Sequence, residues 1–265
     1  MIIESGMKRI PGMLFLLLPV FCSAAYAGCV DTDCSKKQDG TWKIQHFGDC
    51  PDEGCTRTKH HKFDPELNKL KNIRSDNQQP VLRSIRWMKG LPDPTNLTEC
   101  GNRDELKQLG EGQKLTVVAW ALTARKGSQE SANCDIKDTK NNKKDTDNHI
   151  VLVDPRIKHP MLKENERNSV TAEFTPRVRR NRHPNFTRKG LNPLIDSTWK
   201  ASQLNPNGKL LVRVTGLLLF DSGHLDQPLK RNTNWEIHPV LKMEYCPKGK
   251  TCRADSDEDW KNLEE

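Results

Sequence analysis

The chain has 265 residues, a formal net charge of +8, and a hydrophobic fraction of only 34%. No stretch reaches the roughly 20 consecutive apolar residues that a membrane-spanning helix needs, so we expect no integral membrane protein. The composition favours one modest core with long loops. The excess of basic residues suggests an anionic partner such as nucleic acid or acidic glycan. A positive net charge that serves only solubility is the alternative explanation.

The first 27 residues match a secretory signal peptide. Lys8 and Arg9 supply its positive start, residues 13–21 are apolar, and small residues occupy the recognition positions Ala25 and Ala27. We therefore expect cleavage after Ala27 and a periplasmic or extracellular location.

Cysteine usage points to the same compartment. The chain has nine cysteines, of which Cys22 would leave with the signal peptide, so an even set remains. An even set in an exported chain predicts disulfides. Zinc is the alternative, but the chain has no C-x-x-C pair. A second alternative is a lipoprotein with Cys29 as the lipidated residue. The expected pairs are Cys50–Cys55, Cys246–Cys252 and Cys100–Cys134.

Residues 28–110 form a cysteine-rich N-terminal region with two helix signals. Asp64 precedes Pro65, which is a helix cap followed by proline at the first helical position. A second short helix is expected over residues 102–109. We expect this region to cap the core, held by disulfides. The first helix is expected to bury an apolar stripe made of Leu67, Leu70 and Ile73.

Residues 111–247 carry the strand pattern. One helix, starting at Asn192 and Pro193, separates the third strand from the fourth, and Gly216 marks a sharp bend in the fourth. This order predicts a mainly β fold, a five-stranded Greek-key barrel of the oligonucleotide/oligosaccharide-binding (OB) type. The acidic tail, residues 248–265, is expected to be disordered. The five expected strands are Lys114–Arg125, His149–Val153, Ser169–Thr175, Lys209–Phe220 and Trp235–Tyr245.

A set of short motifs occurs in order along the chain. The motifs are Cys50-Pro-Asp-Glu-Gly-Cys55, Asp64-Pro-Glu-Leu-Asn-Lys-Leu-Lys-Asn72, Glu130-Ser-Ala-Asn-Cys134, Asp147-Asn-His-Ile150, Glu173-Phe-Thr-Pro-Arg177, His183-Pro-Asn185 and Trp235-Glu-Ile-His-Pro239. Through them the chain resembles a family of uncharacterised bacterial secreted proteins whose members end in a similar Trp-Glu-Ile-His-Pro strand, and the resemblance covers about residues 50–245. It implies an OB-like barrel and no function. More remotely, the strand order is similar to secreted thermonucleases of the staphylococcal type, which implies fold at most.

Polar residues gather where this barrel class places its ligand. That place is the face of the second and third strands, framed by the first and last loops. The residues expected there are Glu130, Asn133, Asp147, His149, Glu173, Arg177, Asp221, His224, Asp226, Arg231, Trp235, Glu236 and His238.

Three functions compete for this face. The first hypothesis is a module that binds an anionic polymer or phosphorylated ligand through cationic side chains and a stacking tryptophan. Its candidate residues are Arg177, Arg179, Arg180, Arg182, His183, His224, Arg231, Trp235 and Glu236.

The second hypothesis is a secreted, nuclease-like phosphodiester hydrolase. His149, Glu173 and His238 are its candidate catalytic residues, because histidine and carboxylate can exchange protons or bind a metal. The third is a structural envelope protein that binds another protein through its N-terminal region. Structural roles compete at each position, since carboxylates pair with arginines and a strand tryptophan usually packs. No motif assigns a metal site, and the cofactor is left unknown.

Overall fold

The computed structural model describes most of the chain beyond the expected signal peptide, which itself lies outside the described residues. Within the described ranges, no helix has both the length and the apolar character that a membrane crossing requires. The described residues are 29, 34, 37–41, 44–57, 63–94, 96–136, 146–198, 208–225 and 230–265.

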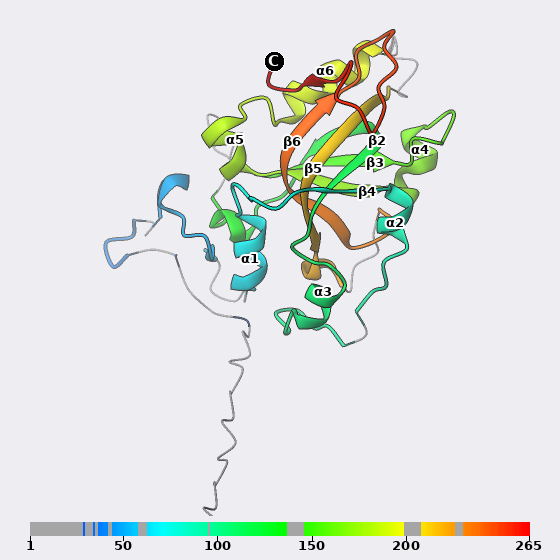
Figure 1. Ribbon diagram of the computed structural model, residues 1–265. Coiled ribbons are helices and arrows are strands. Elements are labelled where there is room, and N and C mark those ends of the chain that lie inside the picture. The colour runs from blue at the N-terminus through cyan, green and yellow to red at the C-terminus, as the bar shows by residue number, and fades with distance from the viewer. Residues whose placement is uncertain are drawn as a thin grey trace, which may run out of the picture.

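Five strands close into a barrel (Figure 1). They are β2 (Lys114–Lys126), β3 (Asn148–Val153), β4 (Val170–Phe174), β5 (Leu210–Phe220) and β6 (Trp235–Tyr245). Each pairs with two of the others in the order β2-β3-β4-β6-β5, and β5 returns to β2. All of these pairs are antiparallel except β4–β6. The expected five-stranded barrel is therefore confirmed.

Alternate residues of β3 and β4 point into the barrel, as the two-residue period of a strand requires. The inward set, which joins the main core, is Ile150, Leu152, Val170, Ala172 and Phe174. The outward set is His149, Val151, Thr171 and Glu173. In β5 the pairing with β6 shifts register at Gly216, where an added Cβ would lie 2.4 Å from the carbonyl oxygen of Pro239. The irregularity expected at this glycine is present.

Helices surround the barrel without covering all of it (Figure 1). One was expected between β4 and β5, and two occur there. The second of them begins before Asn192, because Thr187 Oγ1 accepts a hydrogen bond from Gly190 N, and the Asn192 side chain instead bonds the backbone of Ala124. The helices are α1 (Pro65–Lys71), α2 (Ile85–Lys89), α3 (Asp104–Gln108), α4 (Leu162–Asn165), α5 (Pro176–Arg182) and α6 (Arg188–Thr198); short 3₁₀ turns are η1 (Phe47–Asp49), η2 (Ser131–Asn133), η3 (Glu166–Asn168) and η4 (Ser222–His224).

Two short strands extend the sheet. β1 (Val81–Arg83), which the sequence did not predict, pairs in parallel with β2, and β7 (Lys261–Asn262) pairs with β6. The expectation of a disordered C-terminal tail is therefore wrong. The tail is held because Leu263 is buried in the main core and the guanidinium of Arg213 bonds both Ser256 O and Asp257.

Eight cysteines form four disulfides: Cys29–Cys100, Cys34–Cys55, Cys50–Cys134 and Cys246–Cys252. Only Cys246–Cys252 matches the expected pairing, and the expected pairs Cys50–Cys55 and Cys100–Cys134 are wrong. The reason is that the segment around Gly54 packs against η2, where Cys55 N donates to Ser131 O. This contact turns Cys50 toward the end of η2.

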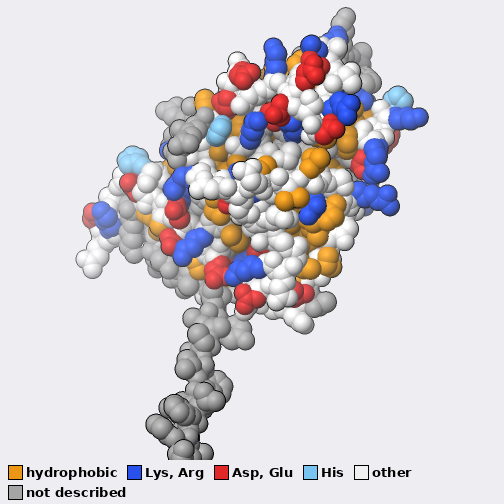
Figure 2. All heavy atoms as spheres, in the orientation of Figure 1, with side chains coloured by type: hydrophobic (Ala, Val, Ile, Leu, Met, Phe, Trp, Pro, Cys, Tyr) orange, Lys and Arg blue, Asp and Glu red, His pale blue; other side chains and the backbone are white. Residues whose placement is uncertain are grey.

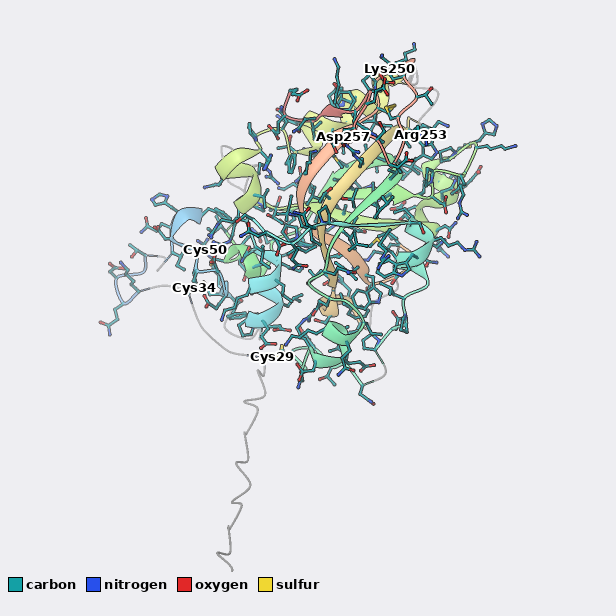
Figure 3. All side chains as sticks on the ribbon, in the orientation of Figure 1. Cys29, Cys34, Cys50, Lys250, Arg253 and Asp257 are labelled. Atoms are coloured by element: carbon teal, nitrogen blue, oxygen red, sulfur yellow. A yellow bond between two sulfur atoms is a disulfide. The ribbon has the colours of Figure 1, made fainter. Side chains whose placement is uncertain are left out.

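The pairing of these sulfurs argues against both the zinc alternative and a lipid on Cys29. Four disulfides are compatible with an extracellular or periplasmic location. In Figure 3 the labelled Cys34 and Cys50 lie on the N-terminal segment, at the opposite end of the molecule from Lys250 and Arg253.

Candidate functional site

A polar pocket of about 360 Å³ opens on the outer face of β3 and β4. This size is in the range of small-ligand sites, and the position is the face that the sequence predicted. Its outer edge carries the basic side chains Arg125, Lys126 and Lys230 together with Glu166, whose carboxylate pairs with Arg125. Its deeper lining includes Glu130, His149, Glu173, Asp221, His224 and Arg231.

His149 and Glu173 face each other across the β3–β4 pair. Directly opposite residues of an antiparallel pair place their side chains in contact. His149 Nε2 lies 3.3 Å from Glu173 Oε1, with 35% of the histidine side chain exposed and only 3% of the glutamate. Gly127 lies against the same ring, because an added Cβ there would be 2.7 Å from His149 Nε2. The imidazole therefore lies between a carboxylate and a backbone segment and lines the pocket, and its Nε2 makes no hydrogen bond among the described residues.

Beneath this pair, β6 adds two buried groups. His238 Nδ1 is 3.2 Å from Glu173 Oε2 and 3.0 Å from Glu236 Oε1. A carboxylate only accepts hydrogen bonds, so Nδ1 carries the proton that it donates to Glu236. Nε2 of His238 is buried and has no hydrogen-bond partner among the described residues.

Arg231 links β6 to the last loop. Its guanidinium donates to Glu236 Oε2 and to Asp221 Oδ2, both at 2.8 Å. Asp221 Oδ2 also lies 2.6 Å from His224 Nδ1, and 45% of the His224 side chain is exposed. The contacts thus run continuously from His149 to His224, and both of these histidines line the pocket.

The N-terminal region supplies a further cation. Lys71, at the end of α1, is buried and lies 2.9 Å from Glu130 Oε2. α1 is held against η2 by two asparagines, since Asn68 Nδ2 donates to Ser131 Oγ and Asn72 Nδ2 donates to Ala132 O. The N-terminal region therefore forms one wall of the site.

The negative charges of the site's carboxylates are balanced by nearby cations to different degrees. Burial, reinforced by Glu236 and Glu130, raises the pKa of Glu173 well above its usual range. Burial likewise raises the pKa of Asp147 to about 6, with Glu130 adding to the effect. Burial would also raise the pKa of Asp221, but Lys71, His224 and Arg231 outweigh it and hold that pKa well below its usual range.

The two pocket histidines shift in opposite directions. Burial lowers the pKa of His149, although Glu130 and Glu236 oppose the shift. The hydrogen bond to Asp221 raises the pKa of His224, against burial. The same residue type is therefore placed in two different electrostatic environments within one pocket.

Several of the expected ligand-binding residues lie elsewhere. Arg177 donates to two backbone carbonyls within residues 50–52 and to the Asp52 carboxylate, which ties α5 to the N-terminal region. Arg180 lies over the Phe47 ring, 4.5 Å from its centroid. Neither residue lines the pocket.

Arg179 is also structural in its contacts. It is buried and donates to the backbone carbonyls of Thr146, Phe174 and Phe186. His183 stacks on Phe186, with ring centroids 4.4 Å apart. The side chain of Arg182, the remaining member of this basic run, lies outside the described residues.

Trp235 is not available to stack on a ligand. Its ring is fully buried against Phe220, and its Nε1 donates to Pro92 O. The structure brings together the remaining expected site residues, namely His149, Glu173, His224, Arg231, Glu236 and His238.

The sequence predicted no role for Lys71, nor for Arg125, Lys126 and Lys230 at the edge of the pocket. One signal was present, because Lys71 follows the buried Leu67 by four positions and so lies on the same face of the helix. Asn133 and Asp147 were expected on this face and are found beside it, 3.4 Å apart.

No protein-family model, curated protein or solved structure matches this chain. The chemistry of the site must therefore come from its own geometry. Two partly exposed imidazoles, each held by a carboxylate, can exchange protons with a bound molecule. The basic edge favours a molecule that carries negative charge.

Proposed function

We propose that this chain is an exported phosphodiester hydrolase and that the outer-face pocket is its active site. The observation that carries the proposal is the placement of His149 and His224. Both line one cavity, each is held by a carboxylate, and the edge of that cavity is basic. Export is supported by the signal-peptide pattern at residues 1–27 and by the four disulfides.

Each group has a role in this proposal. Lys126 and Lys230 attract the phosphate and hold it at the edge of the pocket. His224, hydrogen-bonded to Asp221, is the proton donor for the leaving oxygen. A water molecule attacks the phosphorus while His149 takes its proton, and the bond to the leaving oxygen breaks as His224 protonates that oxygen. Glu173 lies against the His149 ring and positions it. Positioned donors and acceptors of this kind accelerate reactions by about 10²–10⁴-fold each.

A binding module for anionic polymers is the second candidate, favoured by the basic edge of the pocket. Two observations place it behind the hydrolase. The guanidinium groups of Arg177 and Arg179 donate hydrogen bonds to backbone carbonyls, not to the pocket. On the face shown in Figure 2, basic and acidic side chains are interspersed and form no continuous basic stripe.

The test uses the oxidised mature protein, freed of contaminating nucleases, with labelled DNA, labelled RNA and bis(p-nitrophenyl) phosphate. We expect cleavage of at least one substrate by the wild type. The variants His149→Gln and His224→Gln should each lower kcat/KM by about 100-fold or more. His183→Gln, a matched change outside the pocket, should remain within about threefold of wild type.

Other outcomes identify other functions. Salt-sensitive retention of nucleic acid without cleavage would favour the binding module. If the protein neither retains nor cleaves nucleic acid, its ligand is to be sought among glycans and protein partners. Cleavage that survives both pocket substitutions would remove the catalytic assignment.

A further inference from the structure

Several buried polar atoms around the pocket lack hydrogen-bond partners among the described residues, and three of them belong to residues that could together bind a metal ion. The residues are Asp147, Glu173 and His238, and all three are at most 2% exposed. The orphaned atoms are Asp147 Oδ1, Glu173 Oε2 and His238 Nε2. Buried polar atoms are normally satisfied, so three orphans in one cluster need an explanation.

These residues can also meet at one point. Each can place a ligand atom within 4.8 Å of ligand atoms from the other two. His238 is prepared for this role, because its Nδ1–H donates to Glu236 and leaves the Nε2 lone pair unused. Histidines that bind metals characteristically donate their other ring N–H to a carboxylate, which fixes both the tautomer and the ring.

The local charge is also unbalanced. Five carboxylates gather here: Glu130, Asp147, Glu173, Asp221 and Glu236. Three permanent cations face them: Lys71, Arg179 and Arg231. When all five are ionised and the histidines are neutral, the carboxylates exceed the cations by two charges in a buried region, where an unpaired charge is expensive. One divalent cation would balance them.

We propose that Asp147, Glu173 and His238 bind one divalent transition-metal ion beneath the floor of the pocket. One imidazole and two carboxylates suit Zn²⁺ or Mn²⁺ better than Ca²⁺, which prefers an all-oxygen site. A second set of potential ligands, Glu130 with His149 and Glu173, is less suitable because Lys71 already pairs with Glu130. The binding site stands whether or not the pocket hydrolyses phosphodiesters.

The experiment is calorimetric titration of the oxidised mature protein, stripped with EDTA and desalted, with ZnCl₂ and separately with MnCl₂. We expect one ion per chain for at least one of the two metals. Changing a shell residue around a metal typically weakens binding by about 10–100-fold, so Asp147→Asn and His238→Gln should weaken it by about 100-fold or more. His183→Gln should stay within about threefold of wild type. Glu130→Gln, which removes one of the five charges but no ligand, should weaken binding less than Asp147→Asn does.

A spectroscopic measurement covers the case in which a variant does not fold. X-ray absorption at the zinc edge of the wild-type protein should show one imidazole nitrogen, the remaining ligands being oxygen. Two imidazoles would match neither set of ligands and would overturn the proposal. A loss of affinity in Glu130→Gln but not in Asp147→Asn would also overturn it, because it would move the ion to the other set, which likewise has one imidazole. Absence of binding by the wild type would also overturn it.

The outcome is separable from that of the proposed function. Metal binding without phosphodiester cleavage would support the ion site and remove the hydrolase. Cleavage by protein that binds neither metal would support the hydrolase and overturn the ion site.

Discussion

The ammonium group of Lys71 lies 2.9 Å from Glu130 and 3.9 Å from Asp221, although Lys71 belongs to α1 and the two carboxylates follow β2 and β5. The buried cation joins three parts of the chain that are far apart in sequence. The N-terminal region is therefore part of the site, and folding of the barrel and of α1 must be coupled.

Replacing Lys71 by methionine should strongly destabilise the protein. The change leaves Glu130 and Asp221 buried with less compensation, and breaking one partner of a buried ion pair costs about 3–5 kcal/mol. Urea denaturation of the oxidised protein measures the effect. The matched control is Lys69→Met, whose partner Glu53 is as exposed as Lys69 itself, so little change is expected.

A second substitution tests whether the charge is the cause. Glu130→Gln added to Lys71→Met should restore part of the lost stability, because the unpaired carboxylate is gone. If Lys71→Met and Lys69→Met have equal effects, the buried pair does not stabilise the fold.

α1 shows where pattern reasoning failed and why. The sequence predicted burial of Leu67, Leu70 and Ile73, but Asn68 and Lys71 are more deeply buried than Leu70 and Ile73. Apolar periodicity assumes that a helix packs on a hydrophobic surface. Here the surface is a polar loop whose carbonyls and carboxylate need donors, so asparagine and lysine occupy the buried positions.

The barrel was predictable because its strands are long, rich in β-branched residues and ended by clear turn signals. The location of the site followed from the barrel class, and His149, Glu173 and His238 do converge. The disulfides and the basic run were not predictable. Which cysteines meet depends on tertiary packing, and a basic run does not reveal that the guanidinium groups of Arg177 and Arg179 turn toward backbone carbonyls.

Removing the Cys50–Cys134 disulfide should disturb both stability and site. The bond spans 84 residues and ends beside Glu130, whereas Cys246–Cys252 spans 6. In the chain-entropy model these loops correspond to about 4–5 and about 2 kcal/mol. Paired serine substitutions, compared by urea denaturation, should follow that order. Only the first pair should impair binding or turnover in the pocket; equal impairment would contradict the proposed role of the N-terminal wall.

Replacing Gly127 by alanine should displace the His149 ring. The new Cβ would lie 2.7 Å from Nε2 and 3.1 Å from the carbonyl oxygen of Asp147, so the imidazole must move. We expect a changed ¹³C–¹H resonance of the His149 ring and lower activity of the pocket. Gly90→Ala is the control, because its nearest neighbours would be 3.5 Å away. An unchanged His149 resonance would show that the ring is not held by this contact.

The His224–Asp221 pair should make stability depend on pH. The hydrogen bond to Asp221 raises the pKa of His224, while burial, Arg231 and Lys71 oppose it. A raised folded-state pKa gives stability that is fully present below the unfolded value of about 6.5 and is lost as the pH rises through the folded value. His224→Asn should therefore lower Tm more at pH 5.5 than at pH 8.5. The exposed His159→Asn is the control. An equal loss at both pH values would mean that His224 stabilises the fold by packing and not by its charge.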